Sequence, residues 1–452
     1  MAVMILPYPN EITLSEKRRL LQESDLRLEH DDAIEPEGYR LEIDAHDAVL
    51  ASSTDAGRFY GLQTFRQLQD ADGFVPLCAI SDAPRFSWRG FMVDSSRHIQ
   101  TIDEIKAMID AAASYKLNVF HWHLCDDQGW RIESERYPLL HTVGGWRDGW
   151  GFGNPNPEKY GGWFTKAQIR EIVQYCADRF ITVVPEFDMP GHCSAVLKAY
   201  PALSCTGESC DVNTEAGVFS NVLCAGKEAT FDFCCSVLEE IMELFPGEYI
   251  HIGGDEVPKD GWNNCPHCRK RMQDEHLANA EALQGYFTTR IARFLRAHGK
   301  TPIGWNEVLE ADLAPGEIVA TKWWDPKGLC DDFANRGGKV IMEETRHVYL
   351  DYNYQTTSLR QSYSYDLLPD SFTDEGKRNV LGIEAPIWTE WVENFERMGY
   401  QVFPRLLAVA ERGWTNEPQD YAGFKARAEA QRDALGARGI EMAPYADWDP
   451  ED

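Results

Sequence analysis

The sequence predicts an α/β protein in which a (β/α)₈ TIM barrel follows a small α+β domain. From Trp88 onward, short apolar runs alternate with amphipathic stretches, the pattern of parallel strand–helix units. Eight such runs occur, the number that a closed barrel requires. A chain of 452 residues also leaves room for a smaller unit. We therefore expect a small α+β domain at 1–82, the barrel at 83–420, and a C-terminal helix and tail at 421–452.

The N-terminal part shows short-range patterns of both kinds. Residues 39–43 and 48–52 alternate apolar and polar side chains, as half-buried strands do. Residues 57–68 carry apolar side chains at helical spacing. Few residues in this part suggest chemistry, so we expect a supporting domain.

The barrel prediction depends on the order of strands and helices after Trp88. Helices are expected at 102–115, 166–178 and 281–298, and one more at 421–438. An open doubly wound sheet is the alternative, but it would place a glycine-rich phosphate loop after the first strand, and residues 93–97 (Val-Asp-Ser-Ser-Arg) are not one. The predicted strands are 89–94, 118–124, 182–188, 249–253, 301–305, 318–323, 339–343 and 380–385.

Long insertions are expected after the second, third and seventh strands. The segment 144–162 is rich in Gly, Asn, Pro and Trp. Loops of this length in a compact domain usually carry function.

The composition and net charge of the chain argue against some classes of binding partner. The net charge of −29 argues against nucleic acid or an anionic membrane surface, because phosphates would be repelled. No apolar run approaches the roughly 20 residues of a membrane helix. The first residues lack a basic region and a cleavage site, so we expect no signal peptide and a cytoplasmic protein. The 14 tryptophans suit a neutral sugar substrate, and a homodimer is compatible with the sequence.

The 12 cysteines are scattered, and reduced thiols are expected in a cytoplasm. Cys265 and Cys268 form an isolated C-x-x-C, a spacing that could supply half of a zinc site. No second half with matching spacing is evident, so we interpret the pair as structural or incidental. Cys205, Cys210 and Cys224 lie in one loop and could form a disulfide only in an oxidising compartment.

The stretch 249–256, Tyr-Ile-His-Ile-Gly-Gly-Asp-Glu, carries the strongest sign of chemistry. It reads as a buried strand that ends in two glycines and two acids, and glycines permit tight turns and close ligand approach. An isolated acid pair could equally open a surface helix. The other strand ends favour chemistry, because a barrel brings them to one rim. They supply Asp94, Arg97, His121, His123, Asp126, Asp127, Glu186, Asp188, His192, Trp305, Glu307, Trp323, Trp324, Tyr349, Asp351, Glu384, Trp388 and Glu390.

A metal site is the main alternative to a sugar pocket. His121, His123, Asp188 and His192 resemble a hydrolase metal cluster in type. The first strand offers no histidine pair, however, and the ends of the last four strands offer no histidine. We therefore expect no metal and no cofactor, and interpret His121 and His123 as hydrogen-bonded core residues.

Several stretches together match a known family. The chain resembles glycoside hydrolase family 20, the β-N-acetylhexosaminidases, over about residues 37–415. Cys125 stands where the family more often has Thr or Val, and the segment 146–163 is longer than expected. The matching stretches are 84–98, 121–131, 184–192, 251–257, 304–308, 349–351, 388–390 and 404–412.

The resemblance implies a role for each matching residue. Glu256 would be the general acid and base, and Asp255 would hold the acetamido N–H of the substrate. An ionised Asp255 is also expected to raise the pKa of Glu256. The implied binding residues are Tyr349 for the acetamido oxygen, Trp305, Trp323 and Trp388 for the pocket walls, Arg97, Asp351 and Glu390 for ring hydroxyls, and Asp126 with His192, or Asp127 in place of Asp126, for a relay behind Glu256.

The implied reaction is removal of a terminal β-linked GlcNAc or GalNAc from a small oligosaccharide by an exo-acting, retaining enzyme. Adjacent residues such as Asp255 and Glu256 cannot easily flank a sugar from both faces, so the substrate's acetamido oxygen would serve as nucleophile and give an oxazolinium, the route known for this family. Release of a disaccharide, as by a lacto-N-biosidase, and a non-catalytic glycan-binding barrel are the alternatives.

Overall fold

The predicted (β/α)₈ barrel is confirmed. The computed structural model describes residues 4–149, 152, 158–311 and 313–450. Eight parallel strands close into a barrel, with the last strand pairing with the first, and every strand bound lies within two residues of the prediction. The strands are β6 (Trp88–Asp94), β7 (Val119–His123), β12 (Thr182–Glu186), β13 (Tyr249–His251), β14 (Thr301–Trp305), β15 (Val319–Lys322), β16 (Lys339–Met342) and β17 (Val380–Ile387).

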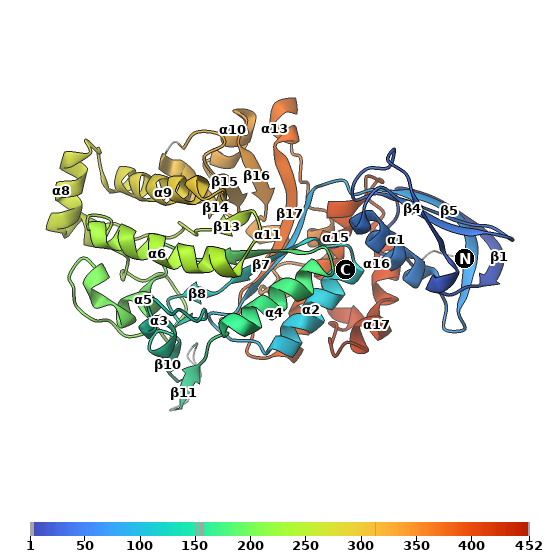
Figure 1. Cartoon of the computed structure of the whole chain (residues 1–452), viewed down its shortest axis with the longest axis horizontal. Helices are drawn as coiled ribbons and strands as arrows, with labels where there is room; N and C mark the ends of the chain where they lie inside the picture. The colour runs from blue at the N-terminus through green and yellow to red at the C-terminus, as the bar shows by residue number, and fades with distance from the viewer. Residues whose placement is uncertain (1–3, 150–151, 153–157, 312, 451–452) are drawn as a thin grey trace.

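Helices surround the barrel and lie along its strands (Figure 1). The helix α2 (Ile102–Ser114) begins at a capping box between Thr101 and Glu104, and its buried face carries Ile105 and Ile109. The other helices are α3 (Leu139–Thr142), α4 (Lys166–Ala177), α5 (Ser194–Ala199), α6 (Glu228–Leu244), α7 (Asp260–Asn264), α8 (Pro266–Asp274), α9 (Ala280–Ala297), α10 (Leu329–Asn335), α11 (Thr345–Val348), α12 (Leu359–Tyr363), α13 (Asp374–Arg378), α14 (Phe395–Val402) and α15 (Arg405–Trp414).

The N-terminal part forms a five-stranded sheet with one helix, α1 (Asp55–Leu68), packed on it. Two of its strands were predicted, whereas β1 was not, because most of its side chains are exposed and show no clean alternation. The strands run in the order β1 (Glu11–Leu20), β5 (Phe74–Asp82), β3 (Tyr39–Ile43), β4 (Ala48–Ser52) and β2 (Arg27–His30). Trp414, at the end of α15, is buried in the core of this sheet.

The prediction of a single helix over 421–438 is wrong. The chain forms α16 (Tyr421–Glu429) and then α17 (Arg432–Gly436). At the break, the Gln431 side-chain amide donates to the Met4 carbonyl at 2.8 Å, which ties this turn to the N-terminal segment. The expected tail is also packed, because Trp448 is fully buried.

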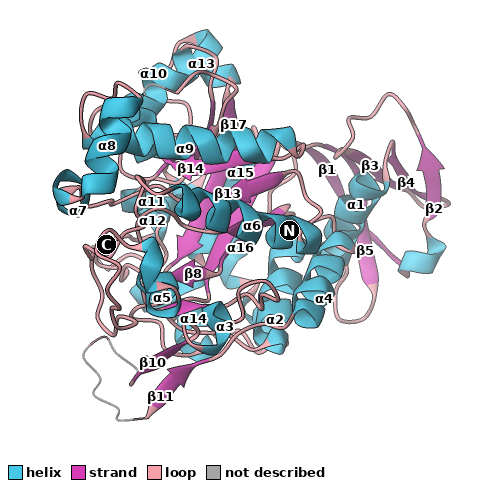
Figure 2. Ribbon diagram, turned by 60° about the vertical axis from the view of Figure 1, so that its left-hand side comes forward, coloured by secondary structure: helices cyan, strands magenta, loops and turns pink. Residues whose placement is uncertain are grey.

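The segment 144–162 forms a hairpin instead of a plain loop. Its strands are β10 (Trp146–Asp148) and β11 (Lys159–Gly161), and Figure 2 shows it projecting from the barrel. Residues 150–151 and 153–157 lie outside the described part, so the functional prediction for this loop is untested. A smaller hairpin, β8 (Cys125–Asp126) with β9 (Gly129–Trp130), follows β7.

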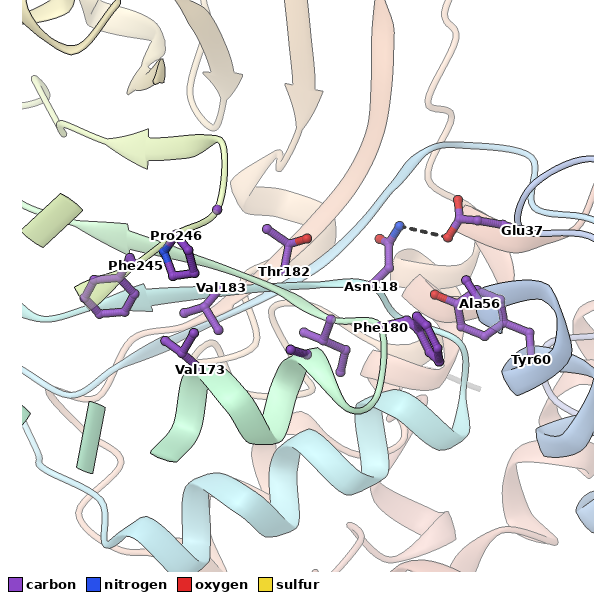
Figure 3. Close-up of a pocket in the computed structure, with 13 residues that line it drawn as sticks. Glu37, Ala56, Tyr60, Asn118, Val173, Phe180, Thr182, Val183, Phe245 and Pro246 are labelled. Carbon is purple, nitrogen blue, oxygen red and sulfur yellow. Dashed lines mark hydrogen bonds between the residues drawn. The ribbon is translucent and has the colours of Figure 1, made fainter. Parts of the chain in front are cut away.

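The barrel end where the strands begin faces the N-terminal sheet. A cavity of about 460 Å³ lies there, between residues such as Tyr60, Phe180 and Phe245 (Figure 3). Asn118 donates to Glu37 across it at 3.3 Å. Chemistry in such barrels takes place at the opposite end, so this cavity reflects how the two parts join. Among the described helices, none combines the length and apolar character needed to cross a membrane.

Candidate active site

A second cavity, of about 540 Å³, opens at the carboxyl ends of the barrel strands. It brings together all the predicted site residues except Trp305. The segments after seven of the eight barrel strands contribute, as the barrel prediction requires. The lining side chains are Arg97, Asp126, Asp188, His192, Asp255, Glu256, Trp323, Tyr349, Asp351, Tyr352, Asn353, Trp388, Glu390, Trp391 and Arg397.

The glycines before the acid pair let the chain turn sharply against the neighbouring loop. Gly253 has a φ of +63°, and a Cβ added there would lie 1.7 Å from the Asp188 carboxylate. Gly254 has a φ of +102° and donates its N–H to Asp188 at 3.1 Å. Only glycine fits this turn, so Asp255 is held at a defined depth in the cavity.

The two acids occupy different environments although they are adjacent in sequence. The Asp255 side chain is 13% exposed, whereas that of Glu256 is 39% exposed. Burial, together with Asp188 and Glu256, raises the pKa of Asp255 well above its usual range, against the opposing effect of His192. Asp255 Oδ1 is buried and has no hydrogen-bond partner among the described residues. It is therefore free to accept a hydrogen bond from a ligand.

His192 connects the acid pair to charged groups behind it. Its Nε2 lies 3.6 Å from Glu256 Oε2 and 3.7 Å from Asp255 Oδ2. Its Nδ1 lies 3.1 Å from Asp126 and 3.3 Å from Asp127. Burial opposes a charge on His192, but these carboxylates outweigh it and raise the pKa of His192 well above its usual value.

Asp126 is the centre of the polar contacts behind His192. It accepts from Arg97 at 2.7 Å and contacts His123 at 2.9 Å. Although Asp126 is buried, Arg97 and His192 hold its pKa well below the usual range. Asp127 instead accepts the Ser194 N–H through Oδ1. Both acids reach His192, so the choice between them for the relay stays open.

Aromatic rings form one side of the cavity. The Tyr349 ring lies 6.2 Å from Trp323 and 6.3 Å from Trp388. Trp323 is oriented by its Nε1, which donates to Glu307 at 2.8 Å. Trp305 is not part of this wall, because it is only 1% exposed and its Nε1 donates to Glu186. The cavity lining thus differs from the predicted wall at this residue, whose ring centroid lies 5.9 Å from that of Trp388.

Charged side chains that can hydrogen-bond sugar hydroxyls also line the cavity. Arg97 lies over the Trp388 ring at 5.1 Å and 3.6 Å from Glu390. Burial and the nearby Glu390 raise the pKa of Asp351 to about 7. Asp351 Oδ1 has no partner among the described residues, so it too can receive a ligand.

The histidines on β7 are hydrogen-bonded inside the barrel, as expected. His121 contacts Glu384 at 2.7 Å and Glu186 at 3.1 Å. His123 bonds Glu186 as well. These carboxylates outweigh burial and raise the pKa of both histidines to about 10. These histidines and carboxylates form a buried charged network inside the barrel.

Five lining residues were not assigned roles from the sequence. Asp188 was recognised only as a strand-end residue. Tyr352, Asn353 and Trp391 follow directly on matched stretches, so extending those stretches would have found them. Arg397 lies on α14, and no local pattern marks it.

Known families and structures were compared with the chain. The model for "Glycosyl hydrolase family 20, catalytic domain" matches residues 86–417, and that for "Glycosyl hydrolase family 20, domain 2" matches residues 6–83. A β-hexosaminidase of Porphyromonas gingivalis is 41% identical over 431 residues, which is 90% of this chain and 54% of that protein. The chain thus spans about half the length of that relative.

Solved structures agree with the sequence comparison. The crystal structure of a β-N-acetylhexosaminidase matches with a TM-score of 0.90 and 30% identity, covering 96% of this chain and 95% of that one. A mutant Streptomyces plicatus β-hexosaminidase in complex with its product GlcNAc matches with a TM-score of 0.85 and 30% identity, covering 99% and 98%. The match over most of the sequence, with the acid pair at the barrel's catalytic end, establishes that the chain belongs to glycosyl hydrolase family 20.

Proposed function

We propose that the protein is an exo-acting, retaining β-N-acetylhexosaminidase that removes a terminal GlcNAc or GalNAc from small oligosaccharides. The observation that carries the proposal is the contrast between Asp255 and Glu256. One acid is deep and has an unpartnered oxygen, and the other is near the mouth beside His192. The β-hexosaminidase relatives, and the GlcNAc bound in the Streptomyces plicatus structure, support the same substrate class.

Glu256 is suited to proton transfer at the scissile bond. Its exposed carboxyl can reach the glycosidic oxygen of a sugar in the cavity, and His192 lies behind it. As the acetamido oxygen attacks C1, the bond from C1 to the leaving oxygen breaks, and Glu256 gives that oxygen its proton. Glu256 then takes a proton from water as the water attacks C1, which reopens the oxazolinium and retains the β configuration.

Asp255 is suited to the acetamido group. Its buried Oδ1 can accept the acetamido N–H, which turns the carbonyl oxygen towards C1. Burial disfavours its charged form in the free enzyme. The positive oxazolinium offsets that cost, so Asp255 would stabilise the intermediate more than the neutral substrate. Tyr349, which is buried at the aromatic wall, would donate to the acetamido oxygen.

Arg97, Asp351 and Glu390 line the cavity beside the aromatic wall and would bind ring hydroxyls. A cavity of about 540 Å³ with these groups on its lining suits one terminal sugar, which supports exo action with release of a monosaccharide.

The test is a panel of aryl β-glycosides that differ only at C2. We expect rapid hydrolysis of the N-acetylglucosaminide and N-acetylgalactosaminide and little hydrolysis of the glucoside and galactoside. Equal rates with and without the acetamido group would contradict substrate assistance. Release of a disaccharide from a trisaccharide would contradict the proposed product.

A further inference from the structure

Four cysteines from two separate parts of the chain meet beside the loop that follows the acid pair. They are Cys205, Cys224, Cys265 and Cys268, and their sulfurs all lie within 4.8 Å of one another. The Sγ of Cys224 lies 3.6 Å from that of Cys268 and 3.7 Å from that of Cys265. Cys205 and Cys268 are 3.9 Å apart. All four are free thiols in the structure.

These separations are those of a tetrahedral metal site. Zinc–thiolate bonds of about 2.3 Å at tetrahedral angles place neighbouring sulfurs about 3.8 Å apart. A disulfide would need its sulfurs at about 2.05 Å. Thiols packed only as small apolar groups have no reason to converge four at a time.

Two pairs build the cluster from opposite sides. Cys265 and Cys268 are the C-x-x-C pair, at the N-terminal end of α8, where the helix dipole favours thiolates. Cys205 and Cys224 come from the insertion after β12, where Ser204 and Leu223 form an antiparallel bridge. Cys205 and Cys224 are therefore the second half of the metal site, which spacing along the sequence did not reveal.

The backbone is adapted to bring the two pairs together. A Cβ on Gly226 would lie 2.2 Å from the His267 carbonyl carbon and 2.3 Å from the Cys268 nitrogen. Any side chain there would push the loop away from α8. Cys224 and Cys268 are fully buried, and Cys265 is 3% exposed. Three of the four thiols are therefore shielded from solvent, and Cys205 is half-buried.

We propose that Cys205, Cys224, Cys265 and Cys268 together bind one Zn²⁺ ion. Four thiolates fill the tetrahedral shell and leave no position for water or substrate, so the site is structural. Four thiolates and one Zn²⁺ carry a net charge of −2. The first turn of α8 and the Lys227 ammonium, which donates to the Ser204 carbonyl at 2.6 Å, lie beside the cluster to balance it.

The metal would hold together two loops that adjoin the active-site residues His192 and Glu256. Leu223, next to Cys224, donates its N–H to Pro190 at 2.9 Å, and Pro190 lies just before His192. Trp262 donates its Nε1 to the Leu223 carbonyl at 2.9 Å, and Trp262 lies between Glu256 and Cys265. Figure 1 shows α8 at the end of the molecule remote from the N-terminal sheet, so the metal acts on the barrel alone.

The test begins with the full chain, purified under reducing conditions without chelator. Elemental analysis should find one zinc per chain. An organomercurial thiol reagent should release that zinc to a chromogenic chelator. Replacing zinc with Co²⁺ should give the visible absorption of a tetrahedral cobalt–thiolate site, a readout independent of glycosidase activity. Metal-free protein with all twelve thiols reactive, iron in place of zinc, or a disulfide among the four cysteines would each overturn the proposal.

Single cysteine-to-serine substitutions test which cysteines bind the metal. Cys268→Ser and Cys224→Ser should each lose most of the bound zinc and lower the Tm. The matched control is Cys234→Ser, because Cys234 is equally buried, on α6, outside the cluster. It should keep one zinc per chain. If the ligand variants do not fold, the cobalt spectrum of the unaltered chain still shows whether a tetrahedral thiolate site exists. Full zinc retention in a folded Cys268→Ser variant would refute the site.

Discussion

His192 Nε2 lies 3.6 Å from the Glu256 carboxylate and 3.7 Å from that of Asp255. A single imidazole therefore contacts both acids of the proposed reaction, while its Nδ1 faces Asp126. The neighbouring carboxylates, Asp126 first, favour the charged form of His192 and raise its pKa. This arrangement couples the proton donor to a buried network, and the predictions below test that coupling and its surroundings.

Glu256→Gln removes the proposed proton donor while keeping the shape of the side chain. We expect kcat/KM for a natural disaccharide to fall by about 10²–10⁴-fold, the usual contribution of general acid–base catalysis. For an aryl substrate with a good leaving group, kcat/KM should fall less, because the departing oxygen depends less on protonation. Steady-state kinetics on both substrates measure the difference. The control is Glu243→Gln, an exposed glutamate near the end of α6, which should leave both rates unchanged.

Asp255→Asn changes the group that would hold the acetamido N–H. The neutral amide cannot balance the positive oxazolinium, so we expect a loss of about 10²-fold or more in kcat, in the range of a lost electrostatic stabiliser. The loss should be specific to substrates that carry the acetamido group. Near-normal turnover of an aryl N-acetylglucosaminide would exclude Asp255 from the reaction.

His192→Phe removes the charge behind Glu256. His192 is a positioning residue, so we expect kcat to fall by about 10–10³-fold, below the loss in Glu256→Gln. The pH–rate profile should also change, because His192, whose pKa is raised by the surrounding carboxylates, no longer titrates 3.6 Å from the Glu256 carboxylate. An unchanged profile with a uniformly lower rate would indicate a purely structural role.

Asp351 makes stability depend on pH. Burial raises its folded-state pKa to about 7, above the ordinary value of about 3.9 for an aspartate. The folded state therefore holds the proton more tightly, and stability is lost as the pH rises from about 4 to 7. Asp351→Asn cannot ionise, so its Tm relative to the unaltered chain should be higher at pH 8 than at pH 4. Groups common to both chains cancel in this comparison. A constant Tm difference across that range would show that Asp351 is not buried as described.

Gly253→Ala tests the turn that positions Asp255. The new Cβ would lie 1.7 Å from Asp188 at a φ of +63°, so we expect a destabilisation of about 1–3 kcal/mol and reduced activity. The control is Gly261→Ala, where no atom lies within 4 Å of an added Cβ. Denaturant unfolding of both variants gives the free-energy difference. Equal stability of the two variants would contradict the turn geometry.

Local patterns predicted most of the barrel. Strands such as β12 and β14 are short, apolar and separated by amphipathic helices, so each is recognisable without its neighbours. The acid pair was recognisable because glycines precede it and because the ends of parallel strands must meet. Edge strands such as β1, whose side chains are mostly exposed, carry no comparable pattern and were missed.

Other features depend on residues that meet only after folding. At the break between α16 and α17, the Gln431 side chain contacts the distant Met4, and nothing local marks this position. Trp305 and Trp323 both lie at the ends of predicted strands, so the sequence does not distinguish them. In the structure Trp305 is buried, whereas Trp323 lines the cavity. Cys205 and Cys268 come together over 63 positions of sequence. Hydrophobic periodicity and turn residues act over a few positions and can be read directly. Burial and convergence of distant side chains arise from chain closure, so they became visible only in the folded molecule.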